Sequence, residues 1–477
     1  DFGAQGVVDR FGQVRPQLLI VADGYRYNGR CFAMDTKVNG VLEQISGIEH
    51  VVRIPFADVP SELAHSSVVE YPDLLQNNTV VPEFTQVNFN HPLYIMYSSG
   101  TTGPPKSIVH GTGGTLLQHL KEHQLQCDLQ PGHRLFWFTT CGWMMWNWLV
   151  SALASRATIV LYDGSPGHPD LGAMWRLAER TGITHFGTSP KFLSACADAG
   201  LVPREEADLQ QFRALLSTGA PLVPEQFDWV YQNVHDDLHL ASISGGTDII
   251  GCFLGGNPLS PVRRGELQCA QLGMDVQAWS PDGERLTGEC GELVCTRPFP
   301  SLPTGFWDDP DGAKYRAAYF GDFPKVWTHG DFVEITAAGG ATIYGRSDTT
   351  LNPGGVRIGT AEIYRAVENL PEIADTIVVG RPVAGDVDIV LCVKMAHGAT
   401  FSDVLADQIC QAIRSATTSR HVPRHVLPVT DIPYTISGKK VEKAVLAAVT
   451  GRPVQNRDAL ANPESLAEYE ALDFGDE

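Results

Sequence analysis

Short apolar runs alternate with amphipathic stretches over roughly the first half of the chain. A short apolar run bounded by turn residues predicts a buried strand, whereas apolar residues that recur at helical spacing predict a helix. Their regular alternation predicts a layered α/β domain with a mainly parallel sheet. The expected strands are 14–22, 51–55, 93–97, 135–138, 158–162, 184–187, 214–217 and 238–243, and the expected helices are 30–46, 113–126, 170–181, 190–199 and 224–233.

The pattern changes after residue 260, where short alternating runs are separated by Gly, Pro and Asp. Turn residues at 281–283 and 338–340 predict a β-rich subdomain over about 260–345, expected as a small distorted barrel. Residues 360–450 return to an α/β pattern and predict a small separate domain, with helices at 361–369 and 402–416 and strands at 375–380 and 388–395.

Composition and charge narrow the class of protein. The 477 residues are 43% hydrophobic and 19% charged, which allows a sizeable core and excludes wholesale disorder. The net charge of −20 argues against nucleic acids and anionic membranes as partners. Residues 454–477 hold seven acids and one Arg, so we expect a solvated helix or a frayed end there.

Three features of the sequence concern the compartment of the protein and its N-terminus. No apolar run reaches the roughly 18 residues of a membrane span, so we expect no membrane partner and a cytoplasmic protein. The chain begins with Asp1 rather than Met, so we expect it to be N-terminally incomplete. The ten cysteines form no CxxC pair and no zinc-type spacing with His, so we expect buried, reduced thiols.

The most informative segment is a loop of small hydroxyl residues and glycines that follows a predicted strand and ends in a lysine. Glycines let backbone N–H groups approach an anion, hydroxyls add donors, and a lysine supplies a point charge, so the loop is suited to polyphosphate. It is not a Walker A loop, because two prolines separate Gly103 from Lys106 and a strand is expected next. The alternative is a plain Ser/Gly surface turn. The candidate phosphate-binding residues are Ser98, Ser99, Gly100, Thr101, Thr102, Gly103 and Lys106.

This loop resembles the phosphate loop of the adenylate-forming acyl-CoA synthetases, a family that includes luciferases and peptide-synthetase adenylation domains. Further motifs of that family follow in the family's order, and the resemblance covers essentially the whole chain. It implies an AMP-binding domain over residues 1–347 and a mobile C-terminal lid over 348–452 that pivots at Asp348. Residues 453–477 would then form an acidic tail.

The resemblance also implies the nucleotide site. At the motif where the family has aromatic-Gly-x-Thr-Glu, this chain has Ser244 to Asp248. Ser244 thus replaces the family's aromatic residue at the position that would stack on adenine, and the acid is one methylene shorter. Thr247 would bind phosphate, Asp248 would hold Mg²⁺, and Asp331 would accept bonds from the ribose hydroxyls. Each stretch taken alone is also compatible with an ordinary turn. The implied ATP- and AMP-binding residues beyond the loop are Gly219, Ala220, Pro221, Ser244, Gly245, Gly246, Thr247, Asp331, Arg346 and Arg357.

The last motifs imply the catalytic lysine and the thiol tunnel. Lys439 occupies the position of the lysine that bridges the carboxylate and the α-phosphate during adenylation, with Thr247 and Asp248 as the other catalytic residues. Gly354, Gly355 and Val356 would line the path of coenzyme A. Residues 414–443 hold six Lys and Arg against two acids, a basic segment that suits a lid over anionic substrates.

The acyl pocket is expected around residues 141–148, where indole and amide donors lie among bulky apolar side chains. Within the family, this stretch and residues 162–166 and 244–253 resemble the acetoacetyl-CoA synthetases. Gly245 would leave room for acetoacetate, and a core helix is the alternative interpretation of the stripe. The implied pocket residues are Trp143, Met144, Asn147 and Gly245.

The resemblance therefore implies an acid–thiol ligase. Acetoacetate, ATP and coenzyme A would give acetoacetyl-CoA, AMP and pyrophosphate through an acyl-adenylate, with Mg²⁺ as cofactor. Two other functions stay open at this point: an adenylation domain that loads a carrier protein, and an inactive, truncated fragment. The sequence leaves the oligomeric state open.

Overall fold

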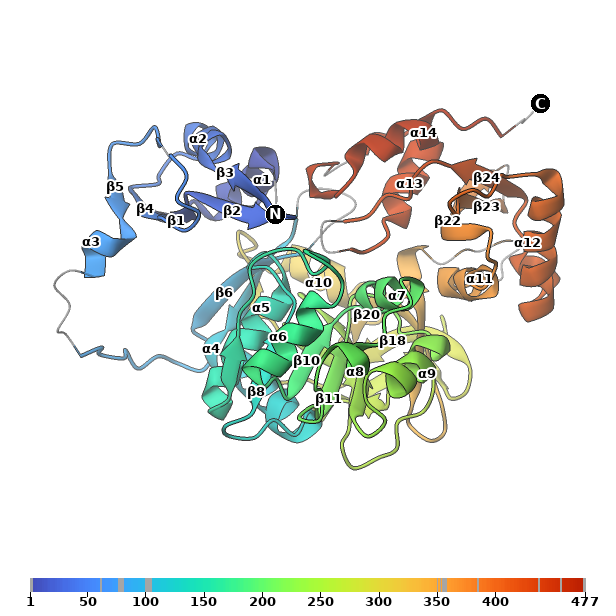
Figure 1. Cartoon of the computed structure of the whole chain (residues 1–477), viewed down its shortest axis with the longest axis horizontal. Coiled ribbons are helices and arrows are strands. Elements are labelled where there is room, and N and C mark those ends of the chain that lie inside the picture. Colours follow the sequence, from blue (N-terminus) through green and yellow to red (C-terminus); the bar gives the residue numbers. More distant parts are fainter. Residues whose placement is uncertain are drawn as a thin grey trace. The chain divides into compact units, whose positions relative to one another are not determined.

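The computed structural model describes residues 3–60, 62–75, 81–98, 105–349, 351, 353, 358–383, 386–435, 438–454 and 457–474 (Figure 1). The chain divides into two compact units, which are described one at a time. Unit 1 lies within residues 1–100, 104–273 and 298–318, and unit 2 within 274–297 and 319–477.

Unit 1 begins with a small α/β segment. Its parallel sheet has the order β1-β4-β5, and the antiparallel pair β2–β3 stands beside it as a separate sheet. Its elements are α1 (Ala4–Val14), β1 (Leu18–Ala22), β2 (Gly24–Tyr27), β3 (Arg30–Ala33), α2 (Asp35–Gln44), β4 (His50–Ile54), β5 (Val68–Glu70) and α3 (Tyr71–Leu75).

The helix expected over 30–46 is wrong in its first part. Residues 30–33 form strand β3, and the helix α2 begins only at Asp35. The reason is the turn before β3, in which Asn28 and Gly29 have φ values of 48° and 72°. An Asn-Gly pair with positive φ at both positions makes the tight turn that joins two antiparallel strands.

The centre of unit 1 is a five-stranded sheet with the order β12-β11-β10-β8-β9, and every pair in it is parallel. The expected layered α/β domain is therefore confirmed. The strands are β8 (Arg134–Trp137), β9 (Thr158–Val160), β10 (His185–Thr188), β11 (Ala214–Ser217) and β12 (His239–Ser242). The helices are α4 (Thr112–Lys121), a π-helical turn (Glu122–Gln126), α5 (Met144–Ser151), a 3-10 turn (Ala152–Ser155), α6 (Ala173–Thr181), α7 (Pro190–Asp198), α8 (Pro203–Glu206) and α9 (Pro224–Asn233).

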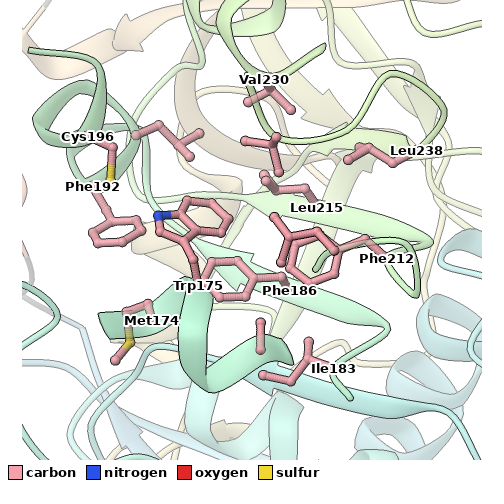
Figure 2. Close-up of a cluster of buried hydrophobic side chains, with 14 of the residues drawn as sticks. Met174, Trp175, Ile183, Phe186, Phe192, Cys196, Phe212, Leu215, Val230 and Leu238 are labelled. Carbon is pink, nitrogen blue, oxygen red and sulfur yellow. The ribbon is translucent and has the colours of Figure 1, made fainter. Parts of the chain in front are cut away.

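An aromatic cluster fills the space between this sheet and helices α6, α7 and α9 (Figure 2). Trp175 of α6 is stacked on Phe186 of β10 with ring centroids 4.9 Å apart, and both side chains are buried. Burial of such large apolar surfaces is the main favourable term in folding, and it holds the strands whose ends carry the site.

Two short antiparallel sheets complete unit 1. Strands β6 (Pro92–Tyr97) and β7 (Ser107–Gly111) flank the predicted phosphate loop, and β19 (Gly305–Phe306) pairs with β7. The second sheet contains β13 (Ser244–Gly246), β14 (Gly251–Gly255) and β15 (Cys269–Ala270). Helix α10 (Ala313–Phe320) follows β19 in the sequence.

Unit 2 contains the expected β-rich part as an antiparallel sheet with the order β17-β16-β18-β20-β21. Strands β17 and β21 are its edges, and the strand pairings of the described residues do not close it into a barrel. Its strands are β16 (Val276–Trp279), β17 (Arg285–Leu286), β18 (Cys290–Cys295), β20 (Trp327–Ile335) and β21 (Ala341–Arg346).

The C-terminal part of unit 2 is a three-layer α/β arrangement around β22, β23 and β24 (Figure 1). Alternate residues of β22 and β23 point to opposite faces, so Val378 packs with α11 and α12 while Ile377 packs with α13 and α14. Whether the part after residue 348 moves as a lid stays a prediction. The elements are α11 (Thr360–Val367), β22 (Ile373–Val383), β23 (Asp386–Met395), α12 (Asp403–Ala416), β24 (His425–Val429), α13 (Glu442–Val449) and α14 (Leu466–Glu470).

The expectation of a solvated helix or a frayed end over 454–477 is right in that a helix, α14 (Leu466–Glu470), is present, but this helix is packed against the core rather than solvated. Leu466 and Tyr469 have exposed fractions of 0%, and both belong to the apolar cluster of α13 and β22. Residues three apart on a helix lie on one face, so Leu466 and Tyr469 both face the core, while Glu470 is exposed and Glu468 accepts hydrogen bonds from Thr430.

The cysteines differ in their exposure. Cys31 and Cys141 are exposed, so the expectation of buried thiols holds only for part of the set, of which Cys127, Cys196, Cys252, Cys295 and Cys392 are buried. Among the helices that the structure describes, none combines the length and apolar character that a membrane crossing requires.

Candidate active site

The phosphate loop is held at its base by two neighbouring strands. Tyr97 of β6 is paired with Ser107 of β7, and the backbone N–H of Ser98 donates to the carbonyl of Lys106 at 3.3 Å. The Ser98 hydroxyl is buried and has no hydrogen-bond partner among the described residues. A buried hydroxyl of this kind is suited to a ligand oxygen, as the phosphate-loop interpretation requires.

Lys106 and Asp248 meet in unit 1. The Lys106 ammonium Nζ lies 3.5 Å from Oδ1 of Asp248, and their side chains are 40% and 20% exposed. The chain thus brings the lysine of the phosphate loop to the acid that we predicted to hold Mg²⁺. A cation beside an acid suits Mg²⁺-polyphosphate, because the lysine can approach phosphate oxygens while the carboxylate approaches the metal.

His110 is a neighbour of this pair that sequence reasoning missed. It lies on β7, is 1% exposed, and its Nε2 donates to the carbonyl of Thr247 at 2.9 Å. Burial lowers the pKa of His110 to about 4, so the ring is neutral near pH 7. The neutral ring can hold the backbone that precedes Asp248, and its position at the end of the phosphate-loop strand was the available signal.

Gly245 is explained by the backbone around it. Gly245 pairs with Cys252 across the β13–β14 ladder, and a Cβ at Gly245 would lie 2.0 Å from the carbonyl oxygen of Gly251. The side chain of any other residue would collide with β14. The close approach of the two strands is thus a reason for glycine at this position, and the room that it would leave for the acyl chain stays a prediction.

The stretch Gly219-Ala220-Pro221 lies beside the same hairpin. Thr218 Oγ1 donates to the carbonyl of Ile243 at 2.8 Å, which ties the end of β11 to the residue before Ser244. Gly219 has a φ of +100°, and a Cβ there would lie 4.0 Å from the Trp143 ring. Gly219, predicted to bind the nucleotide, and Trp143, predicted to line the acyl pocket, are therefore neighbours in unit 1.

The predicted acyl pocket divides into a core part and a more open part. Met144 is buried in the cluster that also holds Trp148, so the core-helix alternative holds for this side of α5. Trp143 and Asn147 are only half-buried. Gly245, the fourth predicted pocket residue, is half-buried as well, and the contact of these residues with an acid stays a prediction.

Glu122 is a second residue that sequence reasoning missed. Its carboxylate is 2% exposed and accepts hydrogen bonds from Trp148 Nε1 at 2.8 Å and from the backbone N–H of Cys252 at 2.9 Å. It thereby ties helix α5 to strand β14. A Glu in an amphipathic stretch gives no sequence signal for such a role, although π-helical turns such as Glu122–Gln126 occur often at functional sites.

In unit 2, Asp331 and Arg346 are directly opposite each other on β20 and β21. Arg346 Nη1 lies 3.1 Å from Asp331 Oδ1, and His329 Nε2 lies 3.7 Å from Asp331 Oδ2. The Asp331 side chain is 11% exposed and that of Arg346 50%. The carboxylate predicted for the ribose and the guanidinium predicted for the nucleotide thus form one cluster.

Lys439 and Lys440 differ sharply in their surroundings. Lys439 is exposed, and its backbone N–H donates to Thr435 Oγ1 at 3.0 Å. The Lys440 ammonium instead contacts Asp375 Oδ1 at 2.8 Å and lies over the Tyr364 ring. This difference favours Lys439 as the lysine that reaches a substrate, and its catalytic role stays a prediction.

Part of the predicted site lies outside the described residues, and Asp348 is described only by its backbone, within the 3-10 turn Ser347–Thr349. In the described part of the chain, no group of three or more His, Cys, Asp or Glu is arranged to hold a metal. The predicted site residues that the structure does not describe are Ser99, Gly100, Thr101, Thr102, Gly103, Gly354, Gly355, Val356 and Arg357.

Comparisons with known proteins identify the family of the chain. The family model of the AMP-binding enzymes matches residues 1–307. The chain is 52% identical over 476 residues to the acetoacetyl-coenzyme A synthetase of Rhizobium meliloti (strain 1021), which covers 99% of this chain and 73% of that protein. It is 46% identical over 480 residues to the acetoacetyl-CoA synthetase of Xenopus tropicalis, covering 98% of this chain and 71% of that one.

A solved structure gives the same result. The acetoacetyl-CoA synthetase from Streptomyces lividans matches with a TM-score of 0.92 and 45% identity, over 98% of this chain and 72% of that chain. Such identity over nearly the whole chain goes beyond a shared fold. The chain therefore belongs to the AMP-binding enzyme family, and within it to the acetoacetyl-CoA synthetases.

Proposed function

We propose that the chain is an acetoacetate–CoA ligase that converts acetoacetate, ATP and coenzyme A to acetoacetyl-CoA, AMP and pyrophosphate. The observation that carries the proposal is the contact between Lys106 and Asp248, 3.5 Å apart, in a chain 52% identical to an acetoacetyl-CoA synthetase. The contact supports a site for metal-bound polyphosphate beside the predicted acyl pocket.

The first half-reaction activates the acid. A carboxylate oxygen of acetoacetate attacks the α-phosphorus of ATP, the bond from that phosphorus to the bridging oxygen breaks, and pyrophosphate leaves. Lys106 and the Ser98 hydroxyl would bind the leaving phosphates, and Lys439 would neutralise charge between the carboxylate and the α-phosphate. Asp331 would accept bonds from the ribose hydroxyls while Arg346, its neighbour, would approach the phosphate.

The residues present fit a magnesium ion held mainly by substrate. Mg²⁺ is usually bound through one or two carboxylates together with phosphate oxygens, rather than by a cage of protein ligands. Asp248 supplies such a carboxylate, partly exposed and beside a phosphate-loop lysine. When bound there, Mg²⁺ would offset the negative charge of the phosphates.

The second half-reaction forms the thioester. The coenzyme A thiolate attacks the carbonyl carbon of the adenylate, and AMP leaves with the electrons of the acyl–oxygen bond. We propose that Lys439 withdraws for this step as the segment after Asp348 turns, and that Gly354, Gly355 and Val356 then line the thiol path. The hinge, the lid and the thiol path rest on the resemblance.

An isotope-exchange experiment tests the function. Exchange of labelled pyrophosphate into ATP requires only the first half-reaction. It should be faster with acetoacetate, the proposed substrate, than with acetate or butyrate. Equal exchange with the three acids would contradict the assignment of the acid. Acyl transfer to a phosphopantetheinyl carrier protein and not to free coenzyme A would favour the carrier-loading alternative, and absence of exchange with every acid would favour an inactive chain.

A further inference from the structure

One carboxylate holds both sides of the turn that carries Lys439. Tyr434 precedes that lysine and Lys440 follows it, and the two residues are paired in an antiparallel bridge. The Tyr434 hydroxyl donates to Asp375 Oδ2 at 2.6 Å, while the Lys440 ammonium lies 2.8 Å from Asp375 Oδ1. Because each oxygen of Asp375 binds one side of the turn, this residue of β22 joins the turn to the sheet.

Lys440 is anchored by further groups of the same unit. Its ammonium donates to the carbonyl of Thr376 and lies 4.2 Å from the centroid of the Tyr364 ring. The Tyr364 hydroxyl donates to Glu442 Oε1 and accepts the backbone N–H of Val378. A lysine held by a carboxylate, a carbonyl and an aromatic face has little freedom to reach a ligand. Lys440 therefore serves as an anchor, and the neighbouring Lys439 remains exposed.

The C-terminal segment forms a second clamp on the same turn. Asn462 Oδ1 accepts the backbone N–H of Tyr434 at 3.0 Å, and the backbone N–H of Ala461 donates to the carbonyl of Tyr434 at 2.8 Å. Leu460 pairs with Thr435. This segment therefore holds the backbone of Tyr434, whereas Asp375 holds the side chains of Tyr434 and Lys440.

We propose that Asp375 is a positioning residue that sets the place of Lys439 by binding Tyr434 and Lys440 on either side of it. The inference rests on the proposed function, because it gives Asp375 a part in adenylation through Lys439. The physical reason is that a shift of about 1 Å in a catalytic group can cost on the order of a hundredfold in rate. Asp375 would not contact the substrate.

The Asp375→Asn variant tests the proposal. It keeps the size of the side chain but removes the charge that holds Lys440, and we expect pyrophosphate exchange to fall by roughly 10- to 100-fold. Thioester formation from preformed adenylate should stay close to wild type. In a Lys439→Ala background, Asp375→Asn should cause no further loss of exchange, because its effect passes through Lys439. Equal slowing of both half-reactions, or a full additional loss in the Lys439→Ala background, would overturn the inference.

Asp388→Asn is the matched control. Asp388 is a carboxylate of the same unit on strand β23, where it pairs with Arg381 and Arg424. The variant should lower the thermal stability of unit 2 without slowing one half-reaction more than the other. If Asp388→Asn slowed pyrophosphate exchange relative to thioester formation as much as Asp375→Asn does, the effect would be a general one of lost ion pairs. That result would overturn the positioning role.

A labelling experiment tests, without relying on activity, whether Asp375 holds the turn that carries Lys439. Brief acetylation of the folded full chain, followed by peptide mass spectrometry, should modify Lys439 well before Lys440. Asp375→Asn should raise the labelling rate of Lys440, and Asp388→Asn should not. Equal rates for the two lysines in the wild type would overturn the inference even if exchange were active. Absence of exchange in the wild type would contradict the proposed function alone, and the labelling would still decide whether Asp375 holds the turn.

Discussion

Lys106 and Asp248 lie 3.5 Å apart, although five parallel strands and the helices between them intervene in the sequence. The phosphate loop between β6 and β7 and the hairpin β13–β14 are placed next to each other by the fold of unit 1. His110 strengthens the link, since its ring binds the backbone carbonyl next to Asp248. The contact joins two motifs whose proximity the sequence only implied.

Replacing Lys106 by Met should lower adenylation with little effect on stability. Lys106 is 40% exposed, so it contributes little to folding, whereas a lost electrostatic contact in the transition state costs on the order of 10²- to 10³-fold. Pyrophosphate exchange measures this loss. Unchanged exchange would contradict the phosphate-loop assignment.

Replacing Asp248 by Asn should raise the Mg²⁺ concentration needed for half-maximal exchange. The amide is neutral and binds Mg²⁺ more weakly than a carboxylate does. Asp248→Glu is the matched control, because it restores the acid that the family has at this position and should keep the Mg²⁺ requirement close to wild type. If both variants behaved alike in Mg²⁺ titrations, Asp248 would not be the metal ligand.

Gly245→Ala should destabilise the protein even though only one methyl group is added. The Cβ would lie 2.0 Å from the Gly251 carbonyl oxygen and 2.6 Å from Cys252 Cα, so the strands β13 and β14 must separate. Overpacking of this kind costs about 1–3 kcal/mol in the free energy of unfolding, which denaturant titration measures. Gly12→Ala, where the nearest contact of the new Cβ is at 4.0 Å within helix α1, should be neutral or stabilising.

Glu122→Ala should be strongly destabilising. The variant leaves the Trp148 indole N–H and the Cys252 backbone N–H buried without their acceptor, and it removes the partner of the buried Lys121 ammonium. Breaking a buried charged pair in this way costs about 3–5 kcal/mol in the free energy of unfolding. Glu225→Ala, which removes a half-exposed carboxylate bound to Arg264, should cost far less, because solvent screens an exposed pair. Similar losses in the two variants would contradict the role of Glu122 as a buried tie.

Unit 1 should lose stability as the pH falls from about 6.5 to 4. Burial lowers the pKa of His185 to about 4 from the ordinary value of 6.5. The unfolded chain therefore binds the proton first, and the stability present above pH 6.5 is lost as the pH approaches the folded-state pKa. Because each unit of difference in pKa between the folded and unfolded states corresponds to about 1.4 kcal/mol, His185 accounts for about 3 kcal/mol of the free energy of unfolding.

Unfolding by denaturant at a series of pH values measures this slope. His185→Gln should flatten it, whereas replacement of the exposed His50 by Gln should leave it as in the wild type. A slope that did not change in His185→Gln would show that other groups cause the acid sensitivity. Burial also lowers the pKa of His123, so part of the slope should persist in the His185 variant.

Local patterns predicted the central elements well. The strand expected over 214–217 and the helix expected over 224–233 are present with those bounds as β11 and α9. Both have a clear pattern, a buried apolar run in one case and an amphipathic stretch that begins with Pro in the other. Strand β3 was missed because its apolar residues also fit a helix, and the Asn28-Gly29 turn that decides the matter was not weighed.

The supports of the site were beyond local patterns. Asp375, Glu122 and His110 act through partners distant in the sequence, and nothing in their neighbours separates them from ordinary polar residues. The packing of the C-terminal segment was missed because its many acids predicted solvent exposure. The spacing of Leu466 and Tyr469, which fits one buried helix face, was the opposing signal. The chemistry-bearing residues, by contrast, come from the ordered motifs, and their roles stay predictions. For Gly245, the motif did not reveal the close approach of strand β14.

The central claim is that this chain joins acetoacetate to coenzyme A at the cost of one ATP converted to AMP. Incubation of the 477-residue chain with acetoacetate, Mg²⁺-ATP and coenzyme A, followed by mass spectrometry of the products, tests it most directly. Acetoacetyl-CoA and AMP should form in equal amounts, and neither should form when acetoacetate is omitted. Formation of ADP in place of AMP, or of no acetoacetyl-CoA, would contradict it.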